Sequence, residues 1–152
     1  MTMTRILPLA AAFLAILLNH AASAANTRQE EANKKTAIAF YDAAINKKDF
    51  DAASKYLGDK YIQHNPQAAD GPEGLKGYIQ FLKGKFPQQH NEFKHVYADG
   101  DFVIVHVHSV QEPGTHGRAI IDIFRLENGK VVEHWDVIQE IPEKANNQNG
   151  MF

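Results

Sequence analysis

One segment near the C-terminus, residues 122–136, constrains the fold more than any other part of the chain. At its centre lies Asn128-Gly129, a dipeptide that tolerates positive φ at both central positions of a type I′ turn. It therefore predicts a β-hairpin with a two-residue turn. With such a turn, Asp122 is expected directly opposite Trp135 on the partner strand.

This expected register fixes the two faces of the hairpin, because side chains alternate between the faces of a strand. The face with the carboxylate is predicted to carry Asp122, Phe124, Trp135 and Val137. His134 and Asp136 are predicted to lie on the opposite, outer face. A carboxylate beside an indole suggests a polar group inside an apolar pocket. The alternative is an aspartate on the surface of an ordinary hairpin.

The hydrophobic period changes along the chain and predicts two structural halves. Apolar residues recur at helical spacing from about 27 to 57, where Asp49 is a plausible N-cap for a second, short helix that Gly58 can close. Pro72 suits the first turn of a third helix. After Pro87 the period is two, which predicts strands near residues 92–97, 102–110, 118–127 and 131–140.

This order predicts an α+β domain in which three N-terminal helices pack in the concave side of a curved antiparallel sheet. The domain is expected over residues 27–141, followed by a flexible tail over 142–152 that lacks apolar periodicity. The strand at 131–138 is apolar or aromatic on both faces, so neither face should be fully exposed to water. We therefore expect a homodimer through the outer face of the sheet.

The N-terminus is typical of a secretory signal peptide over residues 1–24. Arg5 precedes an apolar run, and the small residues Ala22-Ser23-Ala24 form a cleavage site. The apolar run is shorter than the roughly 20 residues that a membrane-spanning helix needs. We therefore expect a periplasmic or secreted protein with no membrane attachment after cleavage near Ala24. The chain contains no cysteine, so it has neither a disulfide framework nor a lipid attachment site.

The charge balance argues against nucleic acid as a partner. The formal net charge is −2, and the lysine pairs at 34–35 and 47–48 are most simply solvated. We instead expect a small apolar ligand or substrate.

Four motifs resemble those of a known family: Phe40-Tyr41-Asp42, Tyr61-Ile62-Gln63-His64-Asn65-Pro66, Ala98-Asp99-Gly100-Asp101, and the hairpin at 122–136. Together they resemble the SnoaL-like polyketide cyclases of the nuclear transport factor 2-like superfamily, over roughly residues 33–140. The resemblance implies a cone-shaped fold around a cavity. It also implies a general acid/base aspartate on the first hairpin strand, which falls on Asp122, and a histidine on the preceding strand, which falls on His108 with His106 beside it.

The resemblance further implies an enzyme without a cofactor, an aldol-type cyclase, isomerase or dehydratase that acts on a small apolar carbonyl compound. Forming an enolate needs a base near the acidic C–H and a donor for the developing oxyanion. A carboxylate in an apolar cavity is a stronger base because desolvation raises its pKa. The residues expected to shape the pocket are His64, Phe124, Trp135 and Tyr41.

Two alternatives remain open. Polyketide assembly takes place in the cytoplasm, so an exported member of such a family is equally compatible with a non-catalytic extracytoplasmic binding domain. A metal site is the second alternative, because His106 and His108 share a strand face that His64 could join. Their spacing from Gly100 resembles a cupin motif, but Ala119 stands where that motif closes with glycine. We see no convincing third and fourth ligand and expect no metal.

Overall fold

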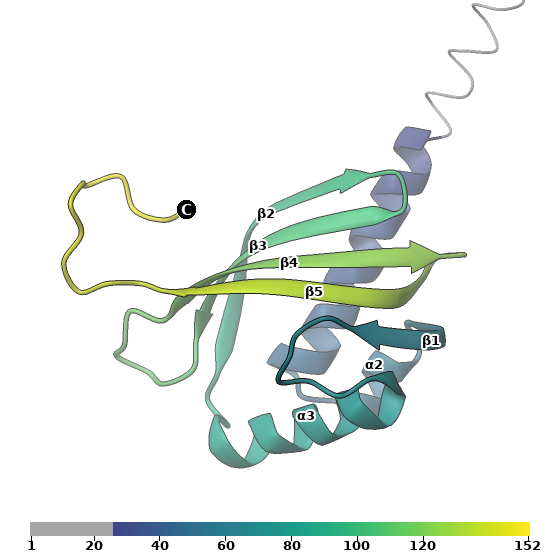
Figure 1. The fold of residues 1–152 in the computed structure, drawn as a ribbon, viewed down its shortest axis with the longest axis horizontal. Coiled ribbons are helices and arrows are strands. Elements are labelled where there is room, and N and C mark those ends of the chain that lie inside the picture. The colour runs from purple at the N-terminus through teal and green to yellow at the C-terminus, as the bar shows by residue number, and fades with distance from the viewer. Residues whose placement is uncertain (1–25) are drawn as a thin grey trace, which may run out of the picture.

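The computed structural model describes residues 26–152, so the predicted signal peptide lies outside the described residues. Helices come first and a curved sheet follows (Figure 1). Residues 26–41 are helical and continue into the π-helix η1. The elements after residue 41 are η1 (Asp42–Asn46), α2 (Phe50–Ser54), β1 (Leu57–Gln63), α3 (Gly71–Lys85), β2 (His90–Asp99), β3 (Phe102–Val110), β4 (Arg118–Glu127) and β5 (Lys130–Glu140).

Local signals account for the short helices. The side chain of Asp49 caps α2 by accepting a hydrogen bond from the backbone N–H of Ala52 at 2.9 Å. Pro72 lies in the first turn of α3, as predicted. Gly58 does not close a helix, because α2 ends at Ser54 and Gly58 already belongs to β1.

The sheet has five strands in the order β1-β5-β4-β3-β2. The α+β class is confirmed, but the sheet is mixed and not purely antiparallel, since β1 pairs in parallel with β5. Residues 57–63 lie outside the four strands that the period-two pattern predicts. Backbone pairing of β1 with the edge of β5 makes it the fifth strand.

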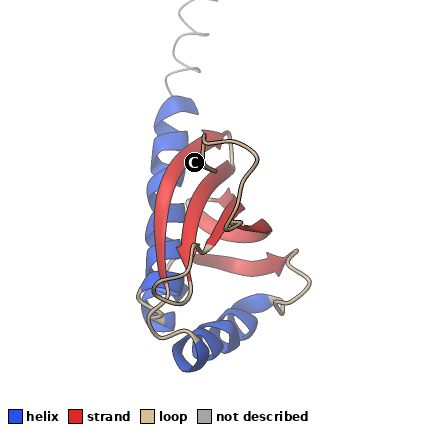
Figure 2. Cartoon of the chain, turned by 90° about the vertical axis from the view of Figure 1, so that its left-hand side faces the viewer, coloured by secondary structure: helices blue, strands red, loops and turns tan. Residues whose placement is uncertain are grey.

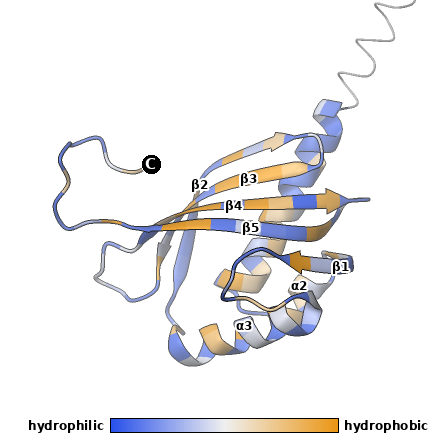
Figure 3. Ribbon diagram, viewed as in Figure 1, coloured by the Kyte–Doolittle hydropathy of each residue, from blue (hydrophilic) through white to orange (hydrophobic). Residues whose placement is uncertain are grey.

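The helices cover one face of the curved sheet. Figure 2 shows the helix at 26–41 running along the strands and α3 lying across one end. Apolar residues concentrate along β3 and β4 (Figure 3). Val103, Val105 and Val107 of β3 are fully buried against this helical layer, together with Phe40 from the first described helix. Within residues 26–152 there is no helix of the length and apolar character that crossing a membrane requires.

The hairpin turn forms as predicted, with φ of 51° at Asn128 and 71° at Gly129. Next to the turn, Leu126 pairs with Val131, but Arg125 then pairs with Glu133. Val132 is therefore an extra residue on β5, a β-bulge that shifts the register of the rest of the strand by one.

The bulge exchanges the faces of β5. Asp122 pairs with Asp136 and Phe124 with His134, so these residues share the concave face. The predicted pairing of Asp122 with Trp135 is wrong, and so is the placement of His134 and Asp136 on the outer face. A one-residue shift reverses every side chain beyond it, because side chains alternate along a strand.

The outer face of the sheet carries aromatic and apolar side chains. Tyr97, Phe102 and Val137 are exposed there, and Phe102 lies near Trp135 with ring centroids 6.2 Å apart. Residues 141–152 form no helix or strand, and they bring Phe152 back over β3. The Phe152 ring centroid lies 5.0 Å from that of His106 and 4.9 Å from that of His108.

Candidate functional site

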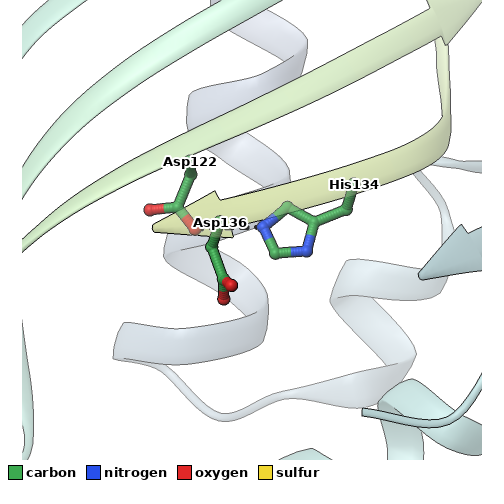
Figure 4. A group of neighbouring side chains, drawn as sticks. All are labelled: Asp122, His134 and Asp136. Carbon is green, nitrogen blue, oxygen red and sulfur yellow. Dashed lines mark hydrogen bonds and ion pairs between the residues drawn. The ribbon is translucent and has the colours of Figure 1, made fainter. Parts of the chain in front are cut away.

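The shifted register brings three titratable side chains together on the concave face. Asp122 projects from β4, and His134 and Asp136 project from β5 toward it (Figure 4). Asp122 is 4% exposed and His134 is 8% exposed. The ring of Phe124, the cross-strand neighbour of His134, stacks on the imidazole with centroids 4.9 Å apart. Packing therefore holds the imidazole plane in place.

A hydrogen-bonded chain links β4, β5 and β1. Nε2 of His134 lies 3.0 Å from Oδ1 of Asp122, and Nδ1 lies 2.7 Å from Oε1 of Gln63. The backbone N–H of Asn65 also points at Oε1 of Gln63, at 3.4 Å. A backbone N–H can only donate, so this contact identifies the Gln63 atom as the amide oxygen.

These hydrogen bonds determine how many protons the side chains of Asp122 and His134 share. Since Oε1 of Gln63 accepts, Nδ1 of His134 must carry a hydrogen. The contact between Nε2 and Oδ1 then needs one further proton, held either by Asp122 as a neutral acid or by His134 as an imidazolium. In both arrangements the Asp122–His134 pair holds one shared proton and has no net charge.

Burial raises the pKa of Asp122 above its ordinary value. The hydrogen bond and charge of His134 act in the opposite direction, Asp136 raises the pKa further, and the hydroxyl of Tyr41 lowers it. The second carboxylate oxygen, Oδ2, is buried and receives no hydrogen bond from any residue between 26 and 152. Asp122 therefore keeps one oxygen for the shared proton and has one oxygen free.

Asp122 lines a pocket between the sheet and the helices. Its walls are largely apolar and aromatic and include Phe40, Tyr41, Tyr61, Leu75, Ile120 and Phe124. Its polar lining includes Gln63, Asn65, Gln89, Arg118, His134 and Asp136. Asn65 donates a hydrogen bond to Oδ2 of Asp136 at 2.6 Å, which anchors the second carboxylate of the site.

The structure does not bring His108 and His106 to Asp122, so their predicted placement is wrong. On β3 the odd-numbered Val105 and Val107 are buried in the core, and the even-numbered histidines therefore point to the outer face. The imidazole of His108 instead lies 2.8 Å from the carbonyl oxygen of His116 in a neighbouring loop.

Of the residues predicted to shape the pocket, Tyr41 and Phe124 line it, whereas His64 and Trp135 do not. The rings of His64 and Trp135 stack with centroids 4.5 Å apart and an interplanar angle of 1°. Nε2 of His64 also contacts Oε1 of Glu133 at 2.8 Å. Because Glu133 and Trp135 take odd-numbered positions on β5, this cluster lies on the outer face.

Comparison with known proteins agrees with this architecture. A family model described as a SnoaL-like domain matches residues 37–134, which is 98 of the 152 residues. The chain belongs to the SnoaL-like family. No curated protein matches the sequence.

Solved structures show the same nuclear transport factor 2-like fold. A SnoaL-like protein of unknown function from Burkholderia thailandensis is 20% identical with a TM-score of 0.61, and the match covers 72% of this chain and 96% of that chain. A proposed polyketide cyclase from Bacillus cereus is 24% identical with a TM-score of 0.60, covering 70% and 74%. A proposed hydroxylase from Streptomyces galilaeus is 20% identical with a TM-score of 0.59, covering 73% and 81%. At these sequence identities, the structural similarity establishes the fold and nothing more.

The site residues predicted from the sequence of this SnoaL-like protein do not include His134, Gln63 and Asp136. One signal was present, because the adjacent valines at 131 and 132 interrupt the alternation expected of a half-buried strand. Both valines are buried. An interruption of this kind marks a bulge, and a bulge moves the following residues to the other face.

The same side chains could hold a metal ion. One potential ligand atom from each of Asp122, His134 and Asp136 lies within 4.8 Å of the others. This group differs from the predicted alternative built on His64, His106 and His108, which lie on the outer face. A cation bound to Nε2 and Oδ1 would have to displace the shared proton, so metal binding and the neutral pair exclude each other.

Proposed function

We propose that the Asp122–His134 pair is a cofactor-independent general acid/base that removes a proton from the carbon next to a carbonyl group of a small, largely apolar compound. The observation that carries this proposal is that Asp122, which lines the pocket, has a buried Oδ2 without a hydrogen-bond partner in the described chain while its Oδ1 is engaged by His134. The reaction class is an aldol-type cyclisation, an isomerisation or a dehydration.

The proton moves in two steps. When the shared proton lies on His134, Asp122 is a carboxylate, and its Oδ2 takes a proton from the acidic C–H of the substrate. The substrate becomes an enolate, Asp122 becomes a neutral acid, and the His134 imidazolium beside it balances the negative charge. Oδ2 then returns the proton to another carbon or to a leaving oxygen, which restores the pair.

Other parts of the chain support this chemistry. Desolvation raises the pKa of Asp122 and makes its carboxylate a stronger base. The Tyr41 hydroxyl lies close enough to Asp122 to lower its pKa, so it is a candidate donor to an enolate oxygen. Apolar walls exclude water from the reacting atoms, which strengthens every electrostatic interaction among them.

The test is hydrogen–deuterium exchange at the α-carbon of aryl methyl ketones in D2O, followed by proton NMR. The protein should accelerate exchange over buffer, and Asp122→Asn should remove the acceleration. As a matched control, Asp99→Asn removes a carboxylate from the exposed β2–β3 turn and should keep full activity. Exchange at the buffer rate for every ketone would contradict the catalytic proposal and favour a non-catalytic binding domain.

We also propose that the mature protein acts outside the cytoplasm, on the strength of the signal-peptide pattern in residues 1–24. N-terminal sequencing of protein from the periplasm or medium should begin near Ala25. Recovery of full-length protein from the cytoplasm alone would contradict export.

A further inference from the structure

Three buried side-chain atoms among residues 26–152 lack a hydrogen-bond partner in the protein: Oδ2 of Asp122, Nε of Arg118 and Oε1 of Gln89. All three residues line the same pocket. An unpaired buried polar group costs about 1–3 kcal/mol, so three such groups on residues that line one pocket indicate a ligand that satisfies them. Asp122 is already explained by the proposed acid/base role, whereas Arg118 and Gln89 are not.

We infer that the pocket takes an organic carboxylate whose anionic group binds Arg118, whose adjacent polar hydrogen is accepted by Gln89, and whose carbonyl end reaches Asp122. This inference rests on the proposed function for the carbonyl end and adds the substrate class.

Arg118 carries an uncompensated positive charge at the pocket wall. No carboxylate of the described chain lies within the 4.0 Å that defines an ion pair with it, and its cross-strand partner Glu140 is exposed. Arg118 lines this pocket and also a second one beside the loop at 111–117. Its charge acts on the first pocket, because it lowers the pKa of Tyr78 and of Tyr41, which both line it. A guanidinium pairs with a carboxylate through two parallel hydrogen bonds, which makes a carboxylate its natural ligand.

The orientation of Gln89 follows from a chain of amides. The backbone N–H of Asn91 donates to Oδ1 of Asn46 at 2.9 Å, which identifies that atom as an oxygen. Nδ2 of Asn91 then donates to the same oxygen at 3.2 Å, which leaves Oδ1 of Asn91 to accept from Nε2 of Gln89 at 3.4 Å. The free atom of Gln89 is therefore its oxygen, an acceptor for a ligand O–H or N–H.

Gln89 and Arg118 lie at the same end of the pocket. Nε2 of Gln89 contacts Oγ of Ser109 at 3.4 Å, and Ser109 is the cross-strand partner of Arg118. Arg118, Ile120 and Asp122 alternate along one face of β4. Four residues of strand separate the two charged groups by about 13 Å between Cα atoms.

The pocket therefore has two chemically different ends with an apolar middle. At one end the Asp122–His134 pair has no net charge and the Asp136 carboxylate repels an anion, while Arg118 at the other end attracts it, so the charges orient an anionic ligand in one direction. The apolar and aromatic walls between them, among them Ile120 and Phe124, fit a ring. The expected ligand is a ring compound with a carboxylate at one end and an enolisable carbonyl at the other.

The probes are 4-acetyl-2-aminobenzoate, whose amino N–H lies next to the carboxylate, and its neutral methyl ester, with binding measured by isothermal titration calorimetry at pH 7. The wild-type protein should bind the carboxylate at least tenfold more tightly than the ester. Arg118→Gln should abolish this preference without weakening ester binding, and Arg118→Lys should retain part of it. Arg125→Gln is the matched control, because Arg125 lies on the same strand but is paired with Glu133 and Glu127.

The inference is overturned if the ester binds as tightly as the carboxylate, if Arg118→Gln weakens both probes equally, or if 4-acetyl-2-aminobenzoate does not bind at millimolar concentration. A thermal melt of each variant confirms that it is folded.

The same probes separate this inference from the proposed function, because deuterium exchange at the acetyl methyl group reports the acid/base chemistry alone. A carboxylate preference without exchange keeps the inference and rejects the catalytic proposal. Equal binding of both probes with equal exchange rejects the inference and keeps the catalytic proposal.

Discussion

Oε1 of Gln63 accepts a hydrogen bond from Nδ1 of His134 at 2.7 Å, so a residue of β1 sets the tautomer of a residue on β5. The parallel pairing of these strands makes this contact possible, since Gln63 and His134 are partners in the register. Gln63 is thus a positioning residue, which acts on Asp122 through the imidazole between them.

Replacing Gln63 should therefore change the pH dependence of the reaction. In Gln63→Leu the hydrogen of His134 can move from Nδ1 to Nε2, and Asp122 can then stay ionised without the shared proton. The high-pH limb of the exchange-rate profile should move to lower pH. The rate at the optimum should fall about tenfold, the equivalent of one hydrogen bond of about 1.4 kcal/mol. Gln63→Glu retains the acceptor and should restore the rate, whereas a wild-type profile for Gln63→Leu would contradict the positioning role.

Asp122→Asn should leave the fold intact and change how stability depends on pH. Because burial raises the pKa of Asp122, the folded protein binds more protons than the unfolded chain between the ordinary and the raised pKa values. The contribution of Asp122 to the free energy of unfolding therefore falls as pH rises through that interval. The amide of the variant does not titrate, and its N–H can donate to Nε2 of His134 in place of the shared proton.

We expect the Asp122→Asn variant to be more stable than the wild type at pH 7, by on the order of 1 kcal/mol, with the difference shrinking toward pH 4. Thermal melts at both values measure this. A lower Tm of the variant at pH 7 would mean that the carboxylate is a structural group.

Divalent cations should inhibit the reaction. Zinc bound to Asp122, His134 and Asp136 would displace the shared proton and occupy the base. Protein purified without a metal-affinity step should contain less than one equivalent of zinc, iron, manganese or copper, and EDTA should not slow exchange. Loss of exchange in EDTA with recovery on adding a metal would make these residues a metal centre.

The outer face should form a homodimer, because Tyr97, Phe102 and Val137 expose apolar surface on three strands of the sheet. Val137 is 69% exposed, so Val137→Glu should cost the monomer little and should shift the protein toward a monomer by burying charge in the contact. Light scattering at micromolar concentration measures the shift, with Lys83→Glu on the exposed face of α3 as the control. A wild-type monomer under these conditions would contradict the interface.

Features with local causes could be predicted from the sequence. The Asn128-Gly129 turn, the Asp49 cap and Pro72 in the first turn of α3 depend on residues next to one another in the chain. Asp122 lines the pocket, as the family resemblance implied, although the predicted pairing with Trp135 that also indicated a pocket is wrong.

The partner of Asp122 could not be predicted in this way, because the bulge depends on a third strand. The backbone N–H of Val131 donates to the carbonyl oxygen of Tyr56 at 2.8 Å, which ties this part of β5 to the start of β1. Val132 packs so closely on Gly58 that a Cβ there would lie 2.6 Å from its Cγ1. Residues more than seventy positions upstream thus stabilise the register of the hairpin. The adjacent valines can mark the bulge within the hairpin, but they do not show which distant strand stabilises it.

The bulge at Val132 sets the register of β5 and therefore determines which of its side chains face the pocket. If Val132 instead paired regularly with Arg125, Trp135 and Val137 would turn inward, and His134 and Asp136 would lie on the opposite surface. Every functional side chain of the strand would still be encoded in the gene, yet none would be in the pocket. In this protein the register of β5, and not only the identity of its residues, determines whether His134 contacts Asp122.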